Sequence, residues 1–226
     1  MVDMAHFSGL VAGKGYPNPC DYAHVVTSTT HKVFRSARGG IILTNHEDLS
    51  KKINTAVFPG YQGGPLMHII AAKAVGFHEA LKPDFKEYIK SVLANAKILS
   101  ETLKNNGFKI YSGGTDTHLM LVDLSPFNVK GNLAAESLSK ANITCNKNGI
   151  PFDSESPMIT SGIRLGSQAA TTRGFGLNEF KLVGELITKT IKGLSENPND
   201  NSKVENEVRN KVVDLCSNFP IYKHLR

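Results

Sequence analysis

The sequence predicts an α/β protein in which an incomplete large domain is followed by a smaller α/β domain. Three short segments near the N-terminus, rich in β-branched residues, follow one another without a helical crossover, whereas strand and helix patterns alternate in the C-terminal part. A long amphipathic helix pattern begins close to Pro83. We therefore expect residues 1–82 to be the remainder of the large domain and residues 83–226 to form the small C-terminal domain.

The N-terminal strands are predicted at residues 1–6, 24–29 and 39–44. The first alternates apolar and polar side chains, the second is rich in valine and threonine, and the third follows a glycine turn. Ser8 and Gly9 supply turn chemistry after the first strand. Because no helical crossover precedes these strands, we expect them to form only part of a sheet.

Helical spacing of apolar side chains follows at residues 48–57, 66–81 and 85–103. Pro65 is expected in the favoured first turn of the second helix, and Gly107 is a typical stop signal for the third.

The rest of the chain alternates strand and helix patterns. The strands are expected at residues 109–111, 118–123, 143–146 and 163–166, and the helices at residues 132–141, 178–194 and 202–218. Ser202 and Glu205 have the spacing of a capping box at the start of the last helix.

The composition is typical of a folded globular protein. With 226 residues, 40% hydrophobic residues and 20 glycines, the chain fits neither a disordered nor a collagen-like protein. Its longest apolar stretch, residues 67–77, is interrupted by Lys73 and is shorter than the roughly 20 residues that cross a bilayer. The N-terminus lacks the pattern of a secretory signal. We therefore expect a cytoplasmic protein without a membrane partner.

Neither a metal site nor a nucleic-acid site is predicted. Cys20, Cys145 and Cys216 are odd in number, far apart and without a CxxC pair, which indicates reduced thiols rather than disulfides or zinc ligands. The net charge of +6 comes from dispersed lysines without an aromatic–basic cluster, so it suits anionic small molecules better than nucleic acid.

Lys32 is a candidate imine-forming residue. It ends the string VVTSTTHK at residues 25–32, where a strand of β-branched residues leads into a hydroxyl-rich turn. A lysine at a strand end can be held rigid and desolvated, and burial lowers the pKa of its amine. Only the neutral amine attacks a carbonyl. The position alone is weak evidence, because most lysines are solvated.

Three further positions suit charged ligands. Asp3 could pair with a pyridinium nitrogen through a buried carboxylate, or it could be a turn acid at a strand end. Arg164, in a strand between glycines, could grip a carboxylate through two parallel hydrogen bonds, with a structural role as the alternative. Gly63 and Gly64 could present backbone N–H groups to a phosphate, although glycine pairs usually mark only turns.

Six strings along the chain together resemble serine hydroxymethyltransferase and keep the order that they have in that family. They are MVDMAH at residues 1–6, VVTSTTHK at 25–32, RGG at 38–40, VFPGYQGGP at 57–65, SGGTDTHL at 112–119 and SGIRLG at 161–166. The similarity runs over essentially the whole chain, and several strings in a fixed order are far more specific than any one of them.

The resemblance implies a fold-type I pyridoxal-phosphate transferase. In that family Lys32 would carry the cofactor as an imine and Asp3 would pair with its pyridinium nitrogen. His6 would lie beside the cofactor, Thr29 would lie close to the imine, and His31 would tune substrate and reaction specificity. For both histidines the alternative is structural, since histidines at strand ends often cap backbone carbonyls.

The resemblance also implies two further binding regions. Arg164 would hold the substrate carboxylate. Gly63 and Gly64 would lie in a loop that reaches across a dimer interface to the neighbour's cofactor phosphate, with Tyr61 standing where the family often has a small residue.

The resemblance implies that one last group of residues contacts the pteridine ring of tetrahydrofolate. This group consists of Asn148, Ser156, Pro157 and Met158. Met158 stands where an aromatic residue is common, which predicts weaker stacking or a position that only packs.

The implied reaction is reversible transfer of the serine hydroxymethyl group to tetrahydrofolate, giving glycine and 5,10-methylenetetrahydrofolate, in one-carbon metabolism and amino-acid biosynthesis. Nothing in the chain resembles the family's N-terminal half, so we expect a C-terminal half that forms a homodimer or associates with that missing half. One alternative is an inactive fragment, or half of a split enzyme that needs its partner. The other is a folate-independent enzyme similar to threonine aldolase.

Overall fold

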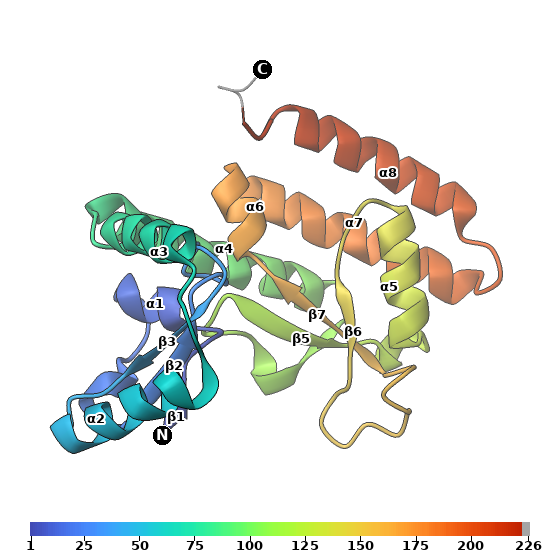
Figure 1. Ribbon diagram of the computed structural model, residues 1–226. Coiled ribbons are helices and arrows are strands. Elements are labelled where there is room, and N and C mark those ends of the chain that lie inside the picture. The colour runs from blue at the N-terminus through green and yellow to red at the C-terminus, as the bar shows by residue number, and fades with distance from the viewer. Residues whose placement is uncertain (223–226) are drawn as a thin grey trace. The chain divides into compact units, whose positions relative to one another are not determined.

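The computed structural model describes residues 1–222 and divides the chain into two compact units, Met1–Lys90 and Ser91–Arg226 (Figure 1). Both units combine helices with a small sheet, so the chain has an α/β fold. The change from one unit to the other falls within the long helix α4, Pro83–Asn105. The assignment of residues 1–82 and 83–226 to a large and a small domain stays a prediction.

The first unit contains a three-stranded sheet in the order β1–β2–β3. The strands are β1, Val2–Asp3, β2, Val26–Thr29, and β3, Gly40–Leu43. β1 and β2 run parallel, whereas β2 and β3 are antiparallel. All three strands lie within their predicted segments, but β1 is only two residues long.

The chain leaves β1 early because it begins a helical turn. The N–H of Ala5 donates to Asp3 Oδ1 at 3.0 Å, and the N–H of Ser8 donates to the Met4 carbonyl at 2.7 Å. The short helix α1, Ser8–Ala12, follows where the sequence had indicated only a turn.

Longer helices follow the sheet of the first unit. They are α2, Glu47–Thr55, and α3, Met67–Ala80, which precede α4 and are joined by the wide helical turn η2, Ala56–Tyr61. A shorter turn, η1, Pro19–Asp21, lies between α1 and β2. Pro65 was predicted in the first turn of the second helix, but α3 begins after Leu66, so Pro65 lies outside it.

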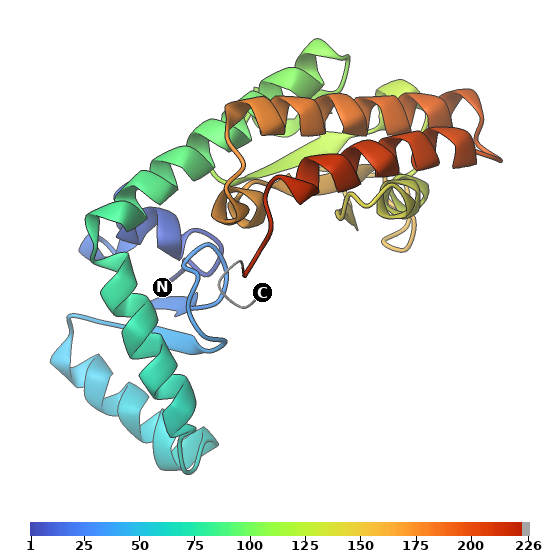
Figure 2. The ribbon, with the colours of Figure 1, turned by 90° about the horizontal axis from the view of Figure 1, so that it is seen from above.

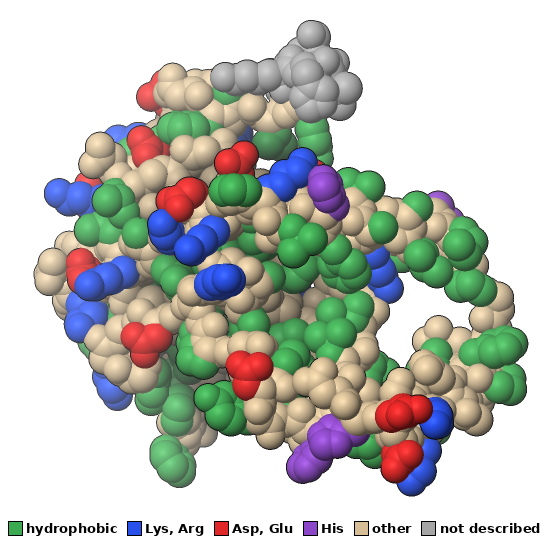
Figure 3. All heavy atoms as spheres, turned by 90° about the vertical axis from the view of Figure 1, so that its left-hand side faces the viewer, with side chains coloured by type: hydrophobic (Ala, Val, Ile, Leu, Met, Phe, Trp, Pro, Cys, Tyr) green, Lys and Arg blue, Asp and Glu red, His purple; other side chains and the backbone are tan. Residues whose placement is uncertain are grey.

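The first unit has a small core and a large exposed apolar surface. Its buried apolar side chains include Leu10, Val26, Val33, Phe85 and Ile89. In contrast, most side chains of α3 and of residues 58–66 before it are exposed, and Figure 3 shows hydrophobic side chains at the surface. The most exposed large apolar side chains of this region are Tyr61 at 92%, Leu81 at 84%, Leu66 at 65%, Met67 at 63%, Phe58 at 63% and Val75 at 60%.

The second unit contains an antiparallel sheet in the order β4–β5–β7–β6. Its strands are β4, Lys109–Ile110, β5, Leu119–Asp123, β6, Asn146–Asn148, and β7, Gly162–Gly166. The helices are α5, Gly131–Lys140, α6, Gln168–Arg173, α7, Leu177–Glu196, and α8, Ser202–Ser217. Two short 3₁₀ turns, η3, Tyr111–Gly113, and η4, Ser125–Phe127, flank β5. Figure 2 shows α7 and α8 side by side, as their contacts confirm.

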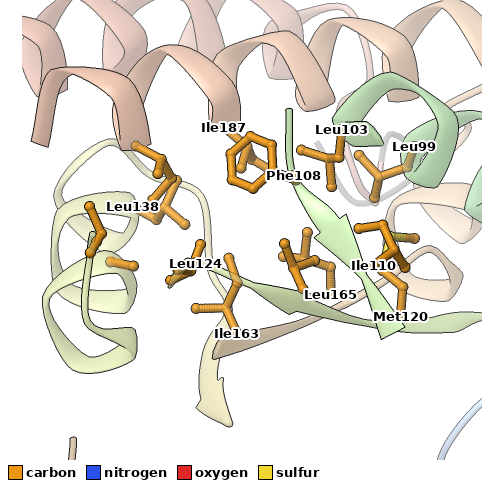
Figure 4. Close-up of a cluster of buried hydrophobic side chains, with 14 of the residues drawn as sticks. Leu99, Leu103, Phe108, Ile110, Met120, Leu124, Leu138, Ile163, Leu165 and Ile187 are labelled. Carbon is orange, nitrogen blue, oxygen red and sulfur yellow. The ribbon is translucent and has the colours of Figure 1, made fainter. Parts of the chain in front are cut away.

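A continuous hydrophobic core lies on one face of this sheet (Figure 4). Met120 and Val122 of β5 and Ile163 and Leu165 of β7 are buried, as the two-residue period of a strand requires. They meet apolar side chains from α4, α5 and α7, among them Leu103, Leu138 and Ile187. Arg164 lies between two core residues of β7 and therefore points to the opposite face.

Three sequence predictions for this unit need correction. The predicted strand 143–146 is displaced, because β6 begins only at Asn146 and pairs with β7 through Asn148. The helix α6 was not predicted. The capping box is wrong: the residue before α8 is Asn201, the N–H of Ser202 donates to Asp200 Oδ1 at 3.0 Å, and Glu205 is buried, where its Oε1 accepts a hydrogen bond from Ser137 Oγ at 2.7 Å.

No helix within residues 1–222 is both long enough and apolar enough to cross a membrane.

Candidate active site

The carboxyl ends of β1 and β2 bring the first candidate residues together. The two strands are parallel, with Asp3 paired to Thr27, so Asp3 and Thr29 lie at the same edge of the sheet. The Thr29 hydroxyl donates to the Ala5 carbonyl at 3.3 Å, just beyond β1. In open α/β sheets, ligands bind outside the carboxyl ends of parallel strands. This edge is therefore the natural position for a site in the first unit.

A tightly bonded turn follows β2 and carries Lys32. Thr30 is buried, and its hydroxyl donates to the carbonyls of Ala37 at 2.5 Å and Gly39 at 3.2 Å. The N–H of Ser36 returns to the Thr30 carbonyl at 2.8 Å, which closes the turn around Lys32. The backbone on either side of Lys32 is thus fixed by hydrogen bonds.

Gly9 of α1 allows a helix to lie directly against this turn. A Cβ atom added to Gly9 would lie 2.6 Å from the backbone carbonyl of Val33, the residue after Lys32. Only glycine permits so close an approach. The sequence pattern indicates only a turn at Gly9, so this packing role is visible only in the structure.

The Lys32 side chain is half-buried, and its amine has no hydrogen bond or ion pair with any residue in 1–222. Beside it, Nδ1 of His31 is buried without a hydrogen-bond partner in the same part of the chain. The Lys32 amine is therefore available to a ligand, whereas the buried His31 Nδ1 has no exposed surface.

Asp3 and His6 are exposed. The exposure of Asp3 differs from the expectation of a buried carboxylate. β1 is an edge strand of the described sheet, so no neighbour covers its outer side. Asp3 Oδ1 accepts the N–H of Ala5, which fits the alternative of a turn acid and leaves Oδ2 without an assigned hydrogen bond within residues 1–222.

Gly63 and Gly64 lie in the exposed segment before α3. A Cβ atom added to either residue would meet nothing within 4 Å, and neither has a positive φ. Nothing in the surrounding structure therefore requires glycine there, and their contact with a phosphate stays a prediction.

The second unit holds the remaining candidates. Arg164 pairs with Leu121 on β5 and with Asn146 on β6, and its guanidinium has no hydrogen bond or ion pair within residues 1–222. Asn148 lies two residues further along β6, opposite Gly162. Its Nδ2 donates to the Gly149 carbonyl at 2.8 Å. Arg164 and Asn148 are therefore on neighbouring strands of one sheet.

The other three candidates, Ser156, Pro157 and Met158, lie on the loop 149–161 between β6 and β7, and all three are exposed. The loop turns around the carboxylate of Asp153, which was not among the residues predicted from the sequence. The cluster of proline, aspartate and serines at residues 151–156 is typical of turn chemistry and was the available signal.

The three cysteines are free thiols, as expected. Burial raises the pKa of Cys145 to about 11, so its thiol stays protonated at neutral pH and is a poor nucleophile. No group of three or more potential metal-binding side chains was found within residues 1–222.

The donor set at the carboxyl ends of β1 and β2 fits pyridoxal phosphate. An amine without an ion-pair partner can condense with an aldehyde, and a carboxylate at the same sheet edge can pair with a ring nitrogen.

Known proteins of one family are similar to this chain over all or most of its length. A family model described as serine hydroxymethyltransferase matches residues 1–187. A protein named serine hydroxymethyltransferase from Pelagibacter ubique is 87% identical over 226 residues, which is 100% of this chain and 52% of the relative. Relatives of the same name from Paramagnetospirillum magneticum and a Marinomonas species are 63% and 62% identical, over 99% and 98% of this chain and 52% of each relative. The chain thus spans about half the length of these relatives.

Proposed function

This chain belongs to the serine hydroxymethyltransferase family, and from that membership we propose that it takes part in reversible transfer of the serine hydroxymethyl group to tetrahydrofolate. The products are glycine and 5,10-methylenetetrahydrofolate, which places the protein in one-carbon metabolism and amino-acid biosynthesis. The proposed architecture is that of a fold-type I pyridoxal-phosphate enzyme. The observation that carries the proposal is the hydrogen-bonded turn that holds Lys32 beside the carboxyl ends of two parallel strands.

Pyridoxal phosphate, when bound, supplies an electron sink that stabilises negative charge on the substrate carbon. Lys32 would hold it covalently through its amine, and Asp3 would keep a proton on the ring nitrogen. Thr29, His6 and His31 would line the same edge. The backbone around Lys32 is already ordered by the turn. Less conformational entropy is therefore lost when the amine reacts with the cofactor.

Arg164 would bind the substrate carboxylate. Its guanidinium has no partner within residues 1–222, so it is available to form two parallel hydrogen bonds to a carboxylate. Asn148 and the exposed residues Ser156, Pro157 and Met158 would contact tetrahydrofolate. In the first unit, Gly63 and Gly64 would present backbone N–H groups to the cofactor phosphate.

The assembly that we propose is a homodimer in the cytoplasm. The exposed apolar side chains of α3 and of the segment before it favour association with further polypeptide over an isolated chain. The same observation supports a second candidate function, in which the chain is inactive by itself and works only with a partner segment. A third possibility is a folate-independent activity similar to that of threonine aldolase. It would be distinguished from the other two by a reaction rate that does not depend on tetrahydrofolate.

Trapping of the cofactor tests the proposed role of Lys32. The chain is expressed with the part of the Pelagibacter ubique relative that it does not match, loaded with pyridoxal phosphate and reduced with borohydride. We expect pyridoxyl mass on the peptide that contains Lys32, together with serine-dependent formation of 5,10-methylenetetrahydrofolate. Lys32→Gln should lose both, whereas Lys52→Gln, which changes an exposed lysine of α2, should keep both. Label on another lysine would contradict the assignment.

A further inference from the structure

The loop 149–161 is organised around a single carboxylate. Asp153 Oδ1 accepts hydrogen bonds from the N–H of Glu155 at 3.0 Å and from the hydroxyl of Ser161 at 2.7 Å. Its Oδ2 accepts the N–H of Ile150 at 3.1 Å and the N–H of Ser161 at 2.9 Å. One side chain therefore connects the beginning, the middle and the end of the loop.

Asp153 carries its charge throughout the neutral pH range. Partial burial acts to raise the pKa of this carboxyl, but the hydrogen bonds from the Ser161 hydroxyl and from the backbone N–H groups of Glu155, Ser161 and Ile150 outweigh it and hold the pKa well below its usual range. Hydrogen bonds to an ionised acceptor are stronger than those between neutral groups.

The N-terminus of α5 fixes the end of the same loop. The N–H groups of Gly131 and Asn132 donate to the carbonyls of Thr160 at 2.8 Å and Ile159 at 2.9 Å. A Cβ atom added to Gly131 would lie 2.1 Å from Thr160 Oγ1, so the helix and the loop are in direct contact. The loop is thus held from inside by Asp153 and from the side by α5.

Side chains on the two sides of this loop differ sharply in exposure. Asp153 and Glu155 are half-buried and Ser161 is buried. Phe152 is 104% exposed and Met158 75% exposed, and Ser156 and Pro157 are exposed as well. An exposed row of polar and apolar side chains on a rigid support is suited to ligand binding, because little entropy is lost when the ligand binds.

We propose that Asp153 is a positioning residue for the tetrahydrofolate cosubstrate. It does not contact the ligand itself, but holds the backbone of the loop so that Ser156, Pro157 and Met158 form one fixed surface next to Asn148. This proposal rests on the proposed function, which names the cosubstrate. It adds Asp153 to the residues on which cosubstrate binding depends, and Asp153 acts by holding the backbone of the loop.

Three single substitutions in the cofactor-loaded assembly test the proposal. Asp153→Asn keeps the size of the side chain, but its NH₂ group cannot accept, so at least one backbone N–H loses its partner whichever way the amide is turned. Ser161→Ala removes one of the four hydrogen bonds and leaves the carboxylate in place. Ser154→Ala changes an exposed serine of the same loop with no hydrogen bond assigned to its side chain, and is the matched control.

We expect Asp153→Asn to raise KM for tetrahydrofolate about ten-fold, with KM for serine and kcat within about two-fold of wild type. Ser161→Ala should have a smaller effect in the same direction, and Ser154→Ala should match wild type. An equal rise of both KM values, or no rise in KM for tetrahydrofolate, would overturn the proposal. A purely structural role would lower the unfolding temperature without separating the two KM values.

Amide hydrogen exchange provides a measurement that does not depend on activity. In Asp153→Asn at least one of the amides of Ile150, Glu155 and Ser161 should exchange about ten-fold faster or more, while amides in β5 and α7 keep their wild-type rates. Unchanged exchange at these three amides would also overturn the proposal. Failure of the proposed function would look different, because the wild-type enzyme itself would then act on serine at a rate independent of tetrahydrofolate.

Discussion

Arg164 is held by the strand β7 on the face opposite the core, with its guanidinium free of partners within residues 1–222. We predict that Arg164→Lys weakens binding of serine by at least about ten-fold, because a single ammonium cannot reproduce two parallel hydrogen bonds to a carboxylate. Retention of pyridoxal phosphate should not change. Titration of the cofactor-loaded assembly with serine, followed by absorbance, measures both. Wild-type affinity for serine in this variant would contradict the assignment.

Acid sensitivity is predicted for the second unit from Asp123 and Asp153. Burial acts to raise the pKa of Asp123, but hydrogen bonds from Ser125 and Lys109 and the positive charge of Lys109 lower it below the usual value, and Asp153 is shifted in the same direction. A carboxyl whose folded pKa is depressed stabilises the fold above its unfolded pKa of about 3.9. That stabilisation is lost as the pH falls through the lower folded value.

The unfolding temperature should therefore be level above about pH 5 and should fall below about pH 4. The double substitution of Asp123 and Asp153 by Asn should lower the unfolding temperature at pH 7. It should also reduce the slope with which the unfolding temperature falls at acid pH. Asp214→Asn, at an exposed position of α8, should keep the wild-type slope. Thermal unfolding followed by circular dichroism between pH 7 and pH 2 measures this. An unchanged slope in the double variant would exclude these carboxylates as its cause.

At the level of elements, the contact between α5 and the loop 149–161 depends on Gly131. We predict that Gly131→Ala destabilises the protein by about 1–3 kcal/mol, because the added methyl group would overlap Thr160 Oγ1 and lie 2.5 Å from the Gly162 carbonyl. Gly114→Ala is the control, since a Cβ atom there would meet nothing within 4 Å. Denaturant titration compares the two variants. Equal stability would show that the helix moves away at no cost.

Most helices and strands could be predicted from the sequence because their side-chain period is strong. α4 is an example: its apolar spacing is regular, and Gly107, with φ +95°, follows its end as expected. The failures have specific causes. Glu205 has the spacing of a cap, but its carboxylate finds a partner in α5, which sequence spacing does not reveal. α1 and α6 are too short to show a period.

The candidate site could be predicted only in part. Local strings indicate Lys32 and Thr29, and the parallel pairing of β1 and β2 then explains why Asp3 lies at the same sheet edge. Asp153 was missed because its role depends on Ser161, eight residues away and on the far side of the loop. Gly9 was missed for a similar reason, since the backbone that it contacts lies beyond β2.

At the level of the whole molecule, the two units differ in how much apolar surface they bury. The second has a continuous core between its sheet and its helices, whereas the first leaves the apolar side chains of α3 exposed. Within residues 1–222 the outer side of β1 is also an unpaired sheet edge. Exposed apolar surface and open strand edges both favour association.

We predict that the 226-residue polypeptide by itself binds a hydrophobic dye strongly, binds pyridoxal phosphate weakly and shows no appreciable hydroxymethyl transfer. Catalytic groups act together, so an incomplete set loses most of its effect. Co-expression with the unmatched part of the Pelagibacter ubique relative should reduce dye binding and restore cofactor absorbance and turnover. Robust turnover by the polypeptide alone would contradict this prediction.

The different exposure of the two sides of the loop 149–161 also bears on how its sequence can change. Its backbone is held by hydrogen bonds to Asp153, which is half-buried, whereas the side chains of Phe152, Ser156 and Met158 are exposed and make no hydrogen bond within residues 1–222. A library randomised at these three outward positions should therefore yield mostly folded proteins, and selection among them could alter which ligand is preferred. The loop would then serve as a fixed frame whose recognition surface is exchangeable.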